Sequence, residues 1–190
     1  MPYARSGFTP SRGTGSVDFI RNLPVNALAK EVAKGDAVTW AAGAILAASA
    51  GTNPTKAGLG VVMAVYTTAG RPLTFQNTKF IASGQVGRAD INMDPWQRYT
   101  VQCLTSVGGT NLFTNVAIDV SAANATTGIS GQSVDILASA SINELFKIIG
   151  LAPFEAVSAP YGQTVLGGVA NNGVEVMWNS HFLRAATAAI

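Results

Sequence analysis

Charged side chains are scarce in this chain: only 12% of its 190 residues are charged, whereas 48% are hydrophobic, and the formal net charge is +2. Soluble domains usually carry about 25% charged residues and a net charge away from zero, because an exposed neutral surface has little repulsion to prevent association. We therefore predict that other protein covers much of this surface, or that small neutral polar groups coat it. Both alternatives favour assembly over catalysis.

Cysteine and histidine are each represented by a single residue. Cys103 cannot form an intrachain disulfide, and its neighbours Tyr99, Val101 and Leu104 predict a strand in which a free cysteine acts as a small hydrophobic residue. His181 has no His or Cys partner at metal-ligand spacing, so we interpret it as a structural or interface residue. The sequence therefore predicts no enzyme, no metal and no cofactor.

Long hydrophobic runs and basic clusters are also missing. The longest apolar run, residues 40–48, has about half the length that a bilayer crossing needs. The N-terminus lacks the apolar stretch of a secretory signal, which predicts a protein made and used without export. The basic group closest to a cluster, Arg5, Arg12 and Arg21, is too small for stable phosphate binding. We expect neither membrane nor nucleic-acid binding.

The chain divides by composition into two parts. Residues 1–25 are punctuated by glycine and proline and contain few large apolar side chains. Such a segment cannot bury enough surface to offset its ordering entropy. We predict an extended N-terminal arm over residues 1–25, mobile until it docks, and a single β-rich domain over residues 26–190. A disordered tail without function is the alternative interpretation of the arm.

Short runs of β-branched and aromatic residues, separated by turn residues, recur through the second part. Residues 28–34 are ambiguous between a strand and two helical turns, and residues 142–151 favour a strand. The other predicted strands cover residues 37–40, 60–66, 73–75, 99–104, 116–120, 134–138 and 174–182. No amphipathic helical stretch of useful length separates them. The fold class is therefore mainly β, an antiparallel sandwich or barrel with at most one or two short helices.

Tryptophan and histidine positions give the candidate contacts. Trp40 and Trp178 fall in predicted strands and are expected in the core. Trp96 follows an Asp-Pro turn and is a candidate interface anchor beside Arg98. At a period of two residues, His181 falls on the opposite face of the last strand from Trp178.

Motifs that would indicate chemistry fail in detail. Residues 90–94 resemble the start of a calcium-binding loop, but Pro95 stands where glycine is required and Val101 stands where a bidentate Glu is required. An Asx turn or an incidental carboxylate pair is the better interpretation. Residues 47–51 match a loosened nucleophile elbow without its strand, helix and later acid and histidine. Neither motif predicts a catalytic site.

Several stretches resemble a known family. Residues 34–38 (KGDAV), followed by the apolar strand at 58–65, resemble the opening of tailed-bacteriophage capsid cement (decoration) proteins. The stretches at 146–151, 173–176 and 179–181 are similar to head-stabilising virion proteins of short-tailed phages. The chain is longer than the shortest cement proteins and has the additional segment before residue 28.

The resemblance implies a non-enzymatic β-structured protein, often trimeric, that binds the capsid exterior at junctions between major capsid subunits. It implies synthesis in the host cytoplasm, location on the virion, and two partners, the major capsid protein and further copies of this chain. The residues expected to make the contacts are Arg5, Arg12, Arg21, Trp96 and Arg98.

Two alternatives stay open. One is a carbohydrate- or receptor-binding β-sandwich module with exposed aromatic residues in a cleft, for which Trp96 and Tyr161 are the candidates. The other is a different virion part, such as a tail-tube or head-completion protein.

Overall fold

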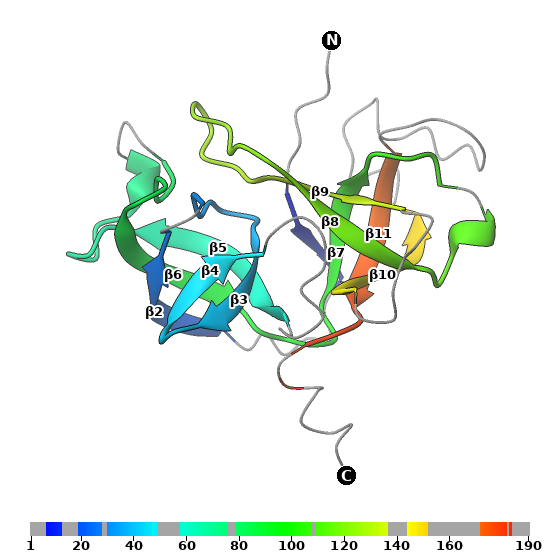
Figure 1. The fold of residues 1–190 in the computed structure, drawn as a ribbon, viewed down its shortest axis with the longest axis horizontal. Coiled ribbons are helices and arrows are strands. Elements are labelled where there is room, and N and C mark those ends of the chain that lie inside the picture. Colours follow the sequence, from blue (N-terminus) through cyan, green and yellow to red (C-terminus); the bar gives the residue numbers. More distant parts are fainter. Residues whose placement is uncertain are drawn as a thin grey trace.

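The computed structural model describes residues 7–12, 19–27, 30–48, 58–75, 79–107, 109–136, 144–151, 172–181 and 183. Within these residues the chain forms eleven strands and two short 3-10 helices, η1 (Leu73–Phe75) and η2 (Gly109–Asn111). The strands build two bodies that lie side by side, a closed barrel and a six-stranded sheet (Figure 1). The predicted mainly β barrel or sandwich class is confirmed.

The barrel has the strand order β2-β4-β3-β5-β6. Its strands are β2 (Phe19–Asn26), β3 (Ala37–Ala41), β4 (Ala44–Ala47), β5 (Gly58–Tyr66) and β6 (Val86–Asn92). Neighbouring strands are antiparallel, except that β2 and β4 meet in parallel at Val25 and Ile45. Aliphatic side chains fill the interior, among them Val38, Ile45, Val62 and Ile91.

The second body has the order β1-β7-β11-β10-β8-β9. Its strands are β1 (Thr9–Arg12), β7 (Arg98–Cys103), β8 (Asn115–Ser121), β9 (Gly131–Asp135), β10 (Phe146–Leu151) and β11 (Asn172–Trp178). The sheet curls until β9 also reaches β7, where Cys103 pairs with Val134. Its core contains four aromatic rings, Phe8, Tyr99, Phe146 and Trp178, within one hydrophobic cluster.

The described residues of the expected N-terminal arm lie in the two bodies instead of extending from them. Strand β1 pairs with β7, and residues 19–25 belong to β2. Phe8 is only 2% exposed; its ring stacks on Phe146 at a centroid distance of 4.4 Å and meets Tyr99 edge-on at 6.3 Å. Burying one aromatic side chain contributes about 2–3 kcal/mol, which the average composition of the segment does not reveal.

Two local predictions are wrong. Residues 73–75 form η1 and not a strand: Tyr66 makes a single bridge to Pro72, and proline has no N–H with which to continue a ladder. Trp40 is 40% exposed and not in the core. Trp40 lies next to the turn that joins β3 to β4. This turn is at the open end of the barrel, so a side chain there is not enclosed by the other strands. Trp178, in contrast, is fully buried as predicted.

The position of Phe8 predicts that the N-terminal segment is part of the folded core. We expect Phe8→Ala to lower the free energy of unfolding by about 3–5 kcal/mol, because it leaves a cavity among stacked rings. Urea denaturation followed by tryptophan fluorescence measures this change. Phe113→Asn is the control, because Phe113 is 69% exposed and has a φ of 66°, which asparagine adopts readily. A Phe8→Ala midpoint equal to that of the control would contradict the assignment.

Candidate functional site

A hydrogen-bonded turn joins the two bodies and presents Trp96. Asn92 ends β6 and Arg98 begins β7, so the turn lies between them. The Asp94 N–H donates to Asn92 Oδ1 at 3.0 Å, and the Trp96 N–H donates to Asp94 Oδ1 at 2.8 Å. Asn92 and Asp94 are buried, whereas Trp96 is 53% exposed. The Asx turn and the position of Trp96 on it are confirmed, and its interface role stays a prediction.

Two of the predicted contact arginines occupy paired backbone positions on neighbouring strands of the second body. Arg12 of β1 lies in register with Arg98 of β7. The Arg98 Nη1 lies 3.6 Å from Glu175 Oε2, and the Ser11 hydroxyl donates to Glu175 Oε1 at 2.7 Å. Trp96 therefore precedes an arginine whose charge is partly balanced by a carboxylate. Arg5, a further predicted contact, lies outside the described residues.

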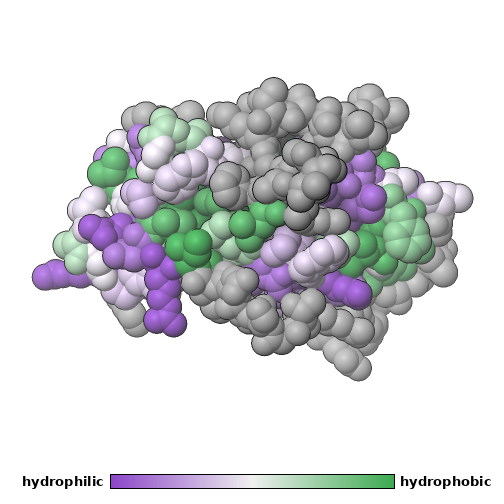
Figure 2. Space-filling model, turned by 90° about the horizontal axis from the view of Figure 1, so that it is seen from below, coloured by the Kyte–Doolittle hydropathy of each residue, from purple (hydrophilic) through white to green (hydrophobic). Residues whose placement is uncertain are grey.

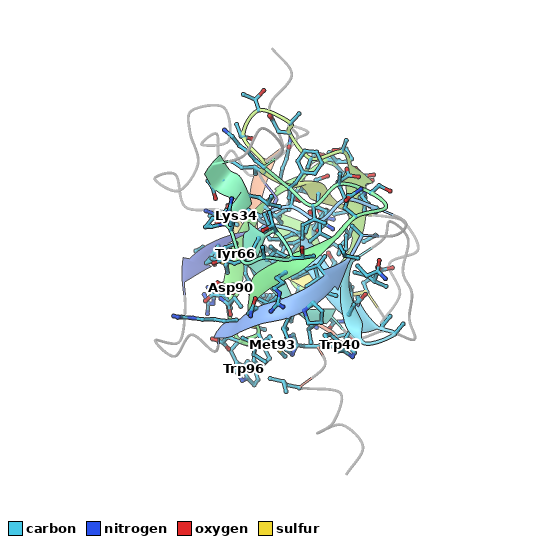
Figure 3. The ribbon with its side chains drawn as sticks, turned by 90° about the vertical axis from the view of Figure 1, so that its left-hand side faces the viewer. Lys34, Trp40, Tyr66, Asp90, Met93 and Trp96 are labelled. Atoms are coloured by element: carbon cyan, nitrogen blue, oxygen red, sulfur yellow. The ribbon has the colours of Figure 1, made fainter. Side chains whose placement is uncertain are left out.

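Trp96 and Trp40 lie at the same end of the barrel, at the lower edge of Figure 3. Ile20 of β2 is also exposed. Figure 2 views the molecule from this side and shows exposed hydrophobic residues in the middle of the face, with hydrophilic groups among them. Exposed apolar groups interspersed with polar ones are compatible with a protein–protein interface.

Arg21 is grouped differently from the prediction, because it lies on the barrel beside Tyr66 and Asp90. The Tyr66 hydroxyl donates to Asp90 Oδ2 at 2.7 Å, and the Asn22 N–H donates to Asp90 Oδ1 at 2.9 Å. The hydrogen bond to Asp90 raises the pKa of Tyr66, while the positive charge of Arg21 acts in the opposite direction. Arg88 of β6 lies in register with Tyr66. The barrel therefore brings Arg21 close to residues that its position in the sequence did not indicate.

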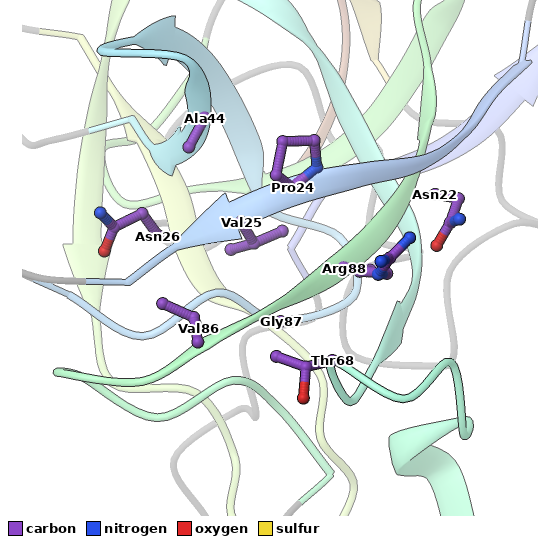
Figure 4. A pocket seen from close by; sticks show the side chains of 9 residues that line it. All are labelled: Asn22, Pro24, Val25, Asn26, Ala44, Thr68, Val86, Gly87 and Arg88. Atoms are coloured by element: carbon purple, nitrogen blue, oxygen red, sulfur yellow. The ribbon is translucent and has the colours of Figure 1, made fainter.

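An open pocket of about 540 Å³ lies on the same barrel wall, between β2 and β6 (Figure 4). Arg88 and Thr68 line it with the two amides Asn22 and Asn26, and Val86 supplies apolar surface. Sequence reasoning missed this pocket. No strand was predicted over β6, where Val86 is exposed and Gly87 is buried, and the pairing of β2 with a strand more than sixty residues later leaves no local signal.

A buried polar network ties the barrel to β9. The Ser130 hydroxyl and the Ala33 N–H both donate to the carboxylate of Asp36. Ser130 Oγ accepts from the Gln132 N–H at 2.9 Å, and Gln132 Oε1 accepts from the Ala37 N–H at 2.7 Å. Such a network holds its members in one arrangement, because breaking it leaves buried polar groups without partners.

Burial dominates the acidity of Asp36. It raises the pKa of this carboxyl to about 7, although the hydrogen bonds from Ser130 and Ala33 and the charge of Lys30 favour the ionised form. The negative charge of Glu31 adds to the effect of burial. Asp36 therefore changes its charge near neutral pH at the point where the two bodies join.

A second contact joins the bodies at the start of β5. The Gly58 N–H donates to the Ser180 carbonyl at 3.2 Å, and a side chain at Gly58 would overlap the indole of Trp178. His181 is fully buried here and meets Trp178 edge-on at a centroid distance of 5.2 Å. Its predicted place on the opposite face is wrong, because β11 ends at Trp178 and the chain then bends.

The single cysteine behaves as predicted. Cys103 is buried in the core of the second body. Desolvation raises the pKa of its thiol, while the hydrogen bond with Thr105 lowers it. A thiol with a raised pKa is a poor nucleophile at neutral pH, so Cys103 acts as a packing residue.

Among the described residues, no three His, Cys, Asp or Glu side chains gather in a group that could hold a metal ion. In that same part of the chain, no helix has the length and apolar character that a bilayer crossing needs. Tyr161, the second aromatic candidate of the carbohydrate-binding alternative, lies outside the described residues. No protein-family model matches the chain, and no curated protein or solved structure matches it either.

The buried carboxyl predicts an unusual pH dependence. Because burial raises the pKa of Asp36 from its ordinary value of 3.8 to about 7 in the folded protein, its contribution to stability is complete below pH 4 and is lost as the pH rises to 7. We expect the free energy of unfolding of the wild type, relative to Asp36→Asn, to fall by about 2–3 kcal/mol between pH 5 and pH 8. Urea denaturation at the two pH values measures this difference. Parallel pH profiles for the two proteins would contradict the assignment.

Proposed function

We propose that this protein is a non-enzymatic structural component of a phage virion, which binds the outer surface of the capsid and cements neighbouring major capsid subunits. The observation that carries the proposal is the exposed Trp96 on a hydrogen-bonded turn between two β bodies. The resemblance of residues 34–38 and 58–65 to capsid cement proteins supports it. The protein acts on the virion exterior after synthesis in the host cytoplasm.

Trp96 suits an interface anchor because its backbone is ordered before binding. Tryptophan is enriched among the few residues that contribute most of the binding energy in protein interfaces. A residue on an ordered turn loses less conformational entropy on binding than a residue on a loose loop. The Asx turns at Asn92 and Asp94 supply this order, and the scarcity of charged residues in the chain keeps desolvation costs low.

The junction between the bodies supports a clamping role. A clamp across two capsid subunits resists their separation only if its own halves stay together. Here Lys34 forms a bridge to Ile129, and the Ser130 N–H donates to the Lys34 carbonyl at 2.8 Å. Contacts on both bodies then act together, so that their combined avidity exceeds each contact alone. Binding only to the assembled lattice raises lattice stability by mass action.

Further copies of this chain are the second proposed partner. A net charge of +2 on 190 residues provides little long-range repulsion between copies. A homotrimer at a three-fold junction of the lattice would multiply the contacts with the capsid.

The role of Trp96 is tested with empty expanded shells assembled from the major capsid protein of the same genome. We expect Trp96→Ala to weaken co-sedimentation with these shells by about tenfold or more, because loss of a central aromatic anchor costs about 2 kcal/mol or more. Phe113→Asn, which also removes an exposed aromatic ring, is the control and should bind as the wild type does. Absence of wild-type binding to the shells would overturn the proposed function. Equal binding by Trp96→Ala and the wild type would remove Trp96 from the contact.

A further inference from the structure

Positive charge is concentrated in the half of the chain that contains the barrel. Residues 1–92 contain nine Lys and Arg against four Asp and Glu, whereas residues 93–190 contain three against six. The two halves therefore carry formal charges of +5 and −3. This asymmetry is hidden in the small net charge of the whole chain. The described residues between 19 and 92, which include the barrel strands, hold six Lys and Arg against three Asp and Glu, a balance that favours acidic partners.

Arg21, Arg71 and Arg88 are exposed and lie on three segments of the barrel next to Tyr66. Arg88 lies in register with Tyr66, and the bridge between Tyr66 and Pro72 places Arg71 beside it. Arg21 is close enough for its charge to affect the pKa of Tyr66. Figure 3 shows Tyr66 and Asp90 next to each other on the barrel.

The arginines keep their charge available. The two carboxylate oxygens of Asp90 accept hydrogen bonds from the Tyr66 hydroxyl and the Asn22 N–H. Within the described part of the chain, no ion pair involves Arg21, Arg71 or Arg88. A carboxylate brought by a partner would find guanidinium groups ready to form paired hydrogen bonds.

The pocket continues this basic surface. Arg88 belongs to both, and Asn22, Asn26 and Thr68 add groups that can donate and accept hydrogen bonds (Figure 4). Pro24 supplies an apolar wall. Amide side chains match the N–H and C=O groups of an extended backbone, and an apolar wall can receive every second side chain of such a segment.

We infer that this face of the barrel, which comprises Arg21, Arg71, Arg88 and the adjoining pocket, is a docking surface for an extended acidic polypeptide segment of the partner protein. The inference rests on the proposed function only in assigning that segment to the major capsid protein. The surface lies on the barrel wall, so it adds a contact to the one made through Trp96.

A polypeptide fits this surface better than a nucleic acid does. Stable binding to a phosphate backbone commonly involves about 6–10 phosphate contacts, whereas this face of the barrel offers three arginines, Arg21, Arg71 and Arg88. The apolar wall at Pro24 and Val86 has no counterpart in phosphate recognition, although it suits alternating peptide side chains. Nucleic-acid binding is therefore the competing outcome of the test.

The surface is tested first without shells. The probe is a rhodamine-labelled decapeptide of alternating Glu and Val, and its binding is followed by fluorescence anisotropy at low and physiological salt. We expect Arg88→Glu to weaken binding by about tenfold or more, which corresponds to about 1.4 kcal/mol. Lys147→Glu, with the same charge change on strand β10, should stay within about twofold of the wild type, because a distant charge is screened. Circular dichroism confirms that both variants fold.

The other outcomes overturn either the inference or the proposed function, and they can be told apart. No wild-type binding of the peptide, or an equal loss in both variants, would show that no defined acidic-peptide surface exists. Tighter and Arg88-dependent binding of a labelled 20-nucleotide single-stranded DNA would assign the surface to nucleic acid. In co-sedimentation with shells, an Arg88→Glu protein that binds like the wild type would overturn the capsid assignment and leave the proposed function standing. If the wild type binds the peptide but does not co-sediment with the shells, the proposed function alone is overturned.

Discussion

Gln132 lies on β9 of the second body, but its side-chain amide completes the backbone hydrogen bonding of the barrel. Its oxygen accepts from the Ala37 N–H, and its nitrogen donates to the carbonyls of Ala37 and Ala48. Buried backbone groups without partners cost about 1–3 kcal/mol each. Neither body is therefore fully satisfied alone, and the two hydrophobic cores are held in one arrangement by this shared boundary.

The N-terminal segment is part of the same boundary. The Phe8 N–H donates to the Gly35 carbonyl, while its ring lies in the aromatic core of the second body. Gly7 adopts a φ of +62°, and a side chain there would meet Ser130 and Gly35. Three distant parts of the chain thus converge where the carboxyl group of Asp36 is buried.

Sequence patterns predicted β8 and β11 from their clear alternation and β5 from its continuous apolar run, and they placed Trp96 on a turn. They failed where tertiary contacts decide the outcome. Phe8 is buried by rings supplied more than ninety residues later, and His181 is turned inward because its strand stops early. The grouping of Arg21 with Arg88 depends on strand pairing around a closed barrel, which no local pattern reveals.

Closure of the barrel also limits backbone-mediated association of a chain that is 48% hydrophobic. Open strand edges offer unpaired backbone groups that recruit other chains into ribbons and fibres. The barrel joins its first and last strands, and β9 reaches round to β7. Strand β1 contains Pro10, which has no N–H that could donate a hydrogen bond to a strand from another chain. The closed and blocked strand edges therefore disfavour aggregation through backbone hydrogen bonds. Association through side chains remains open to the protein.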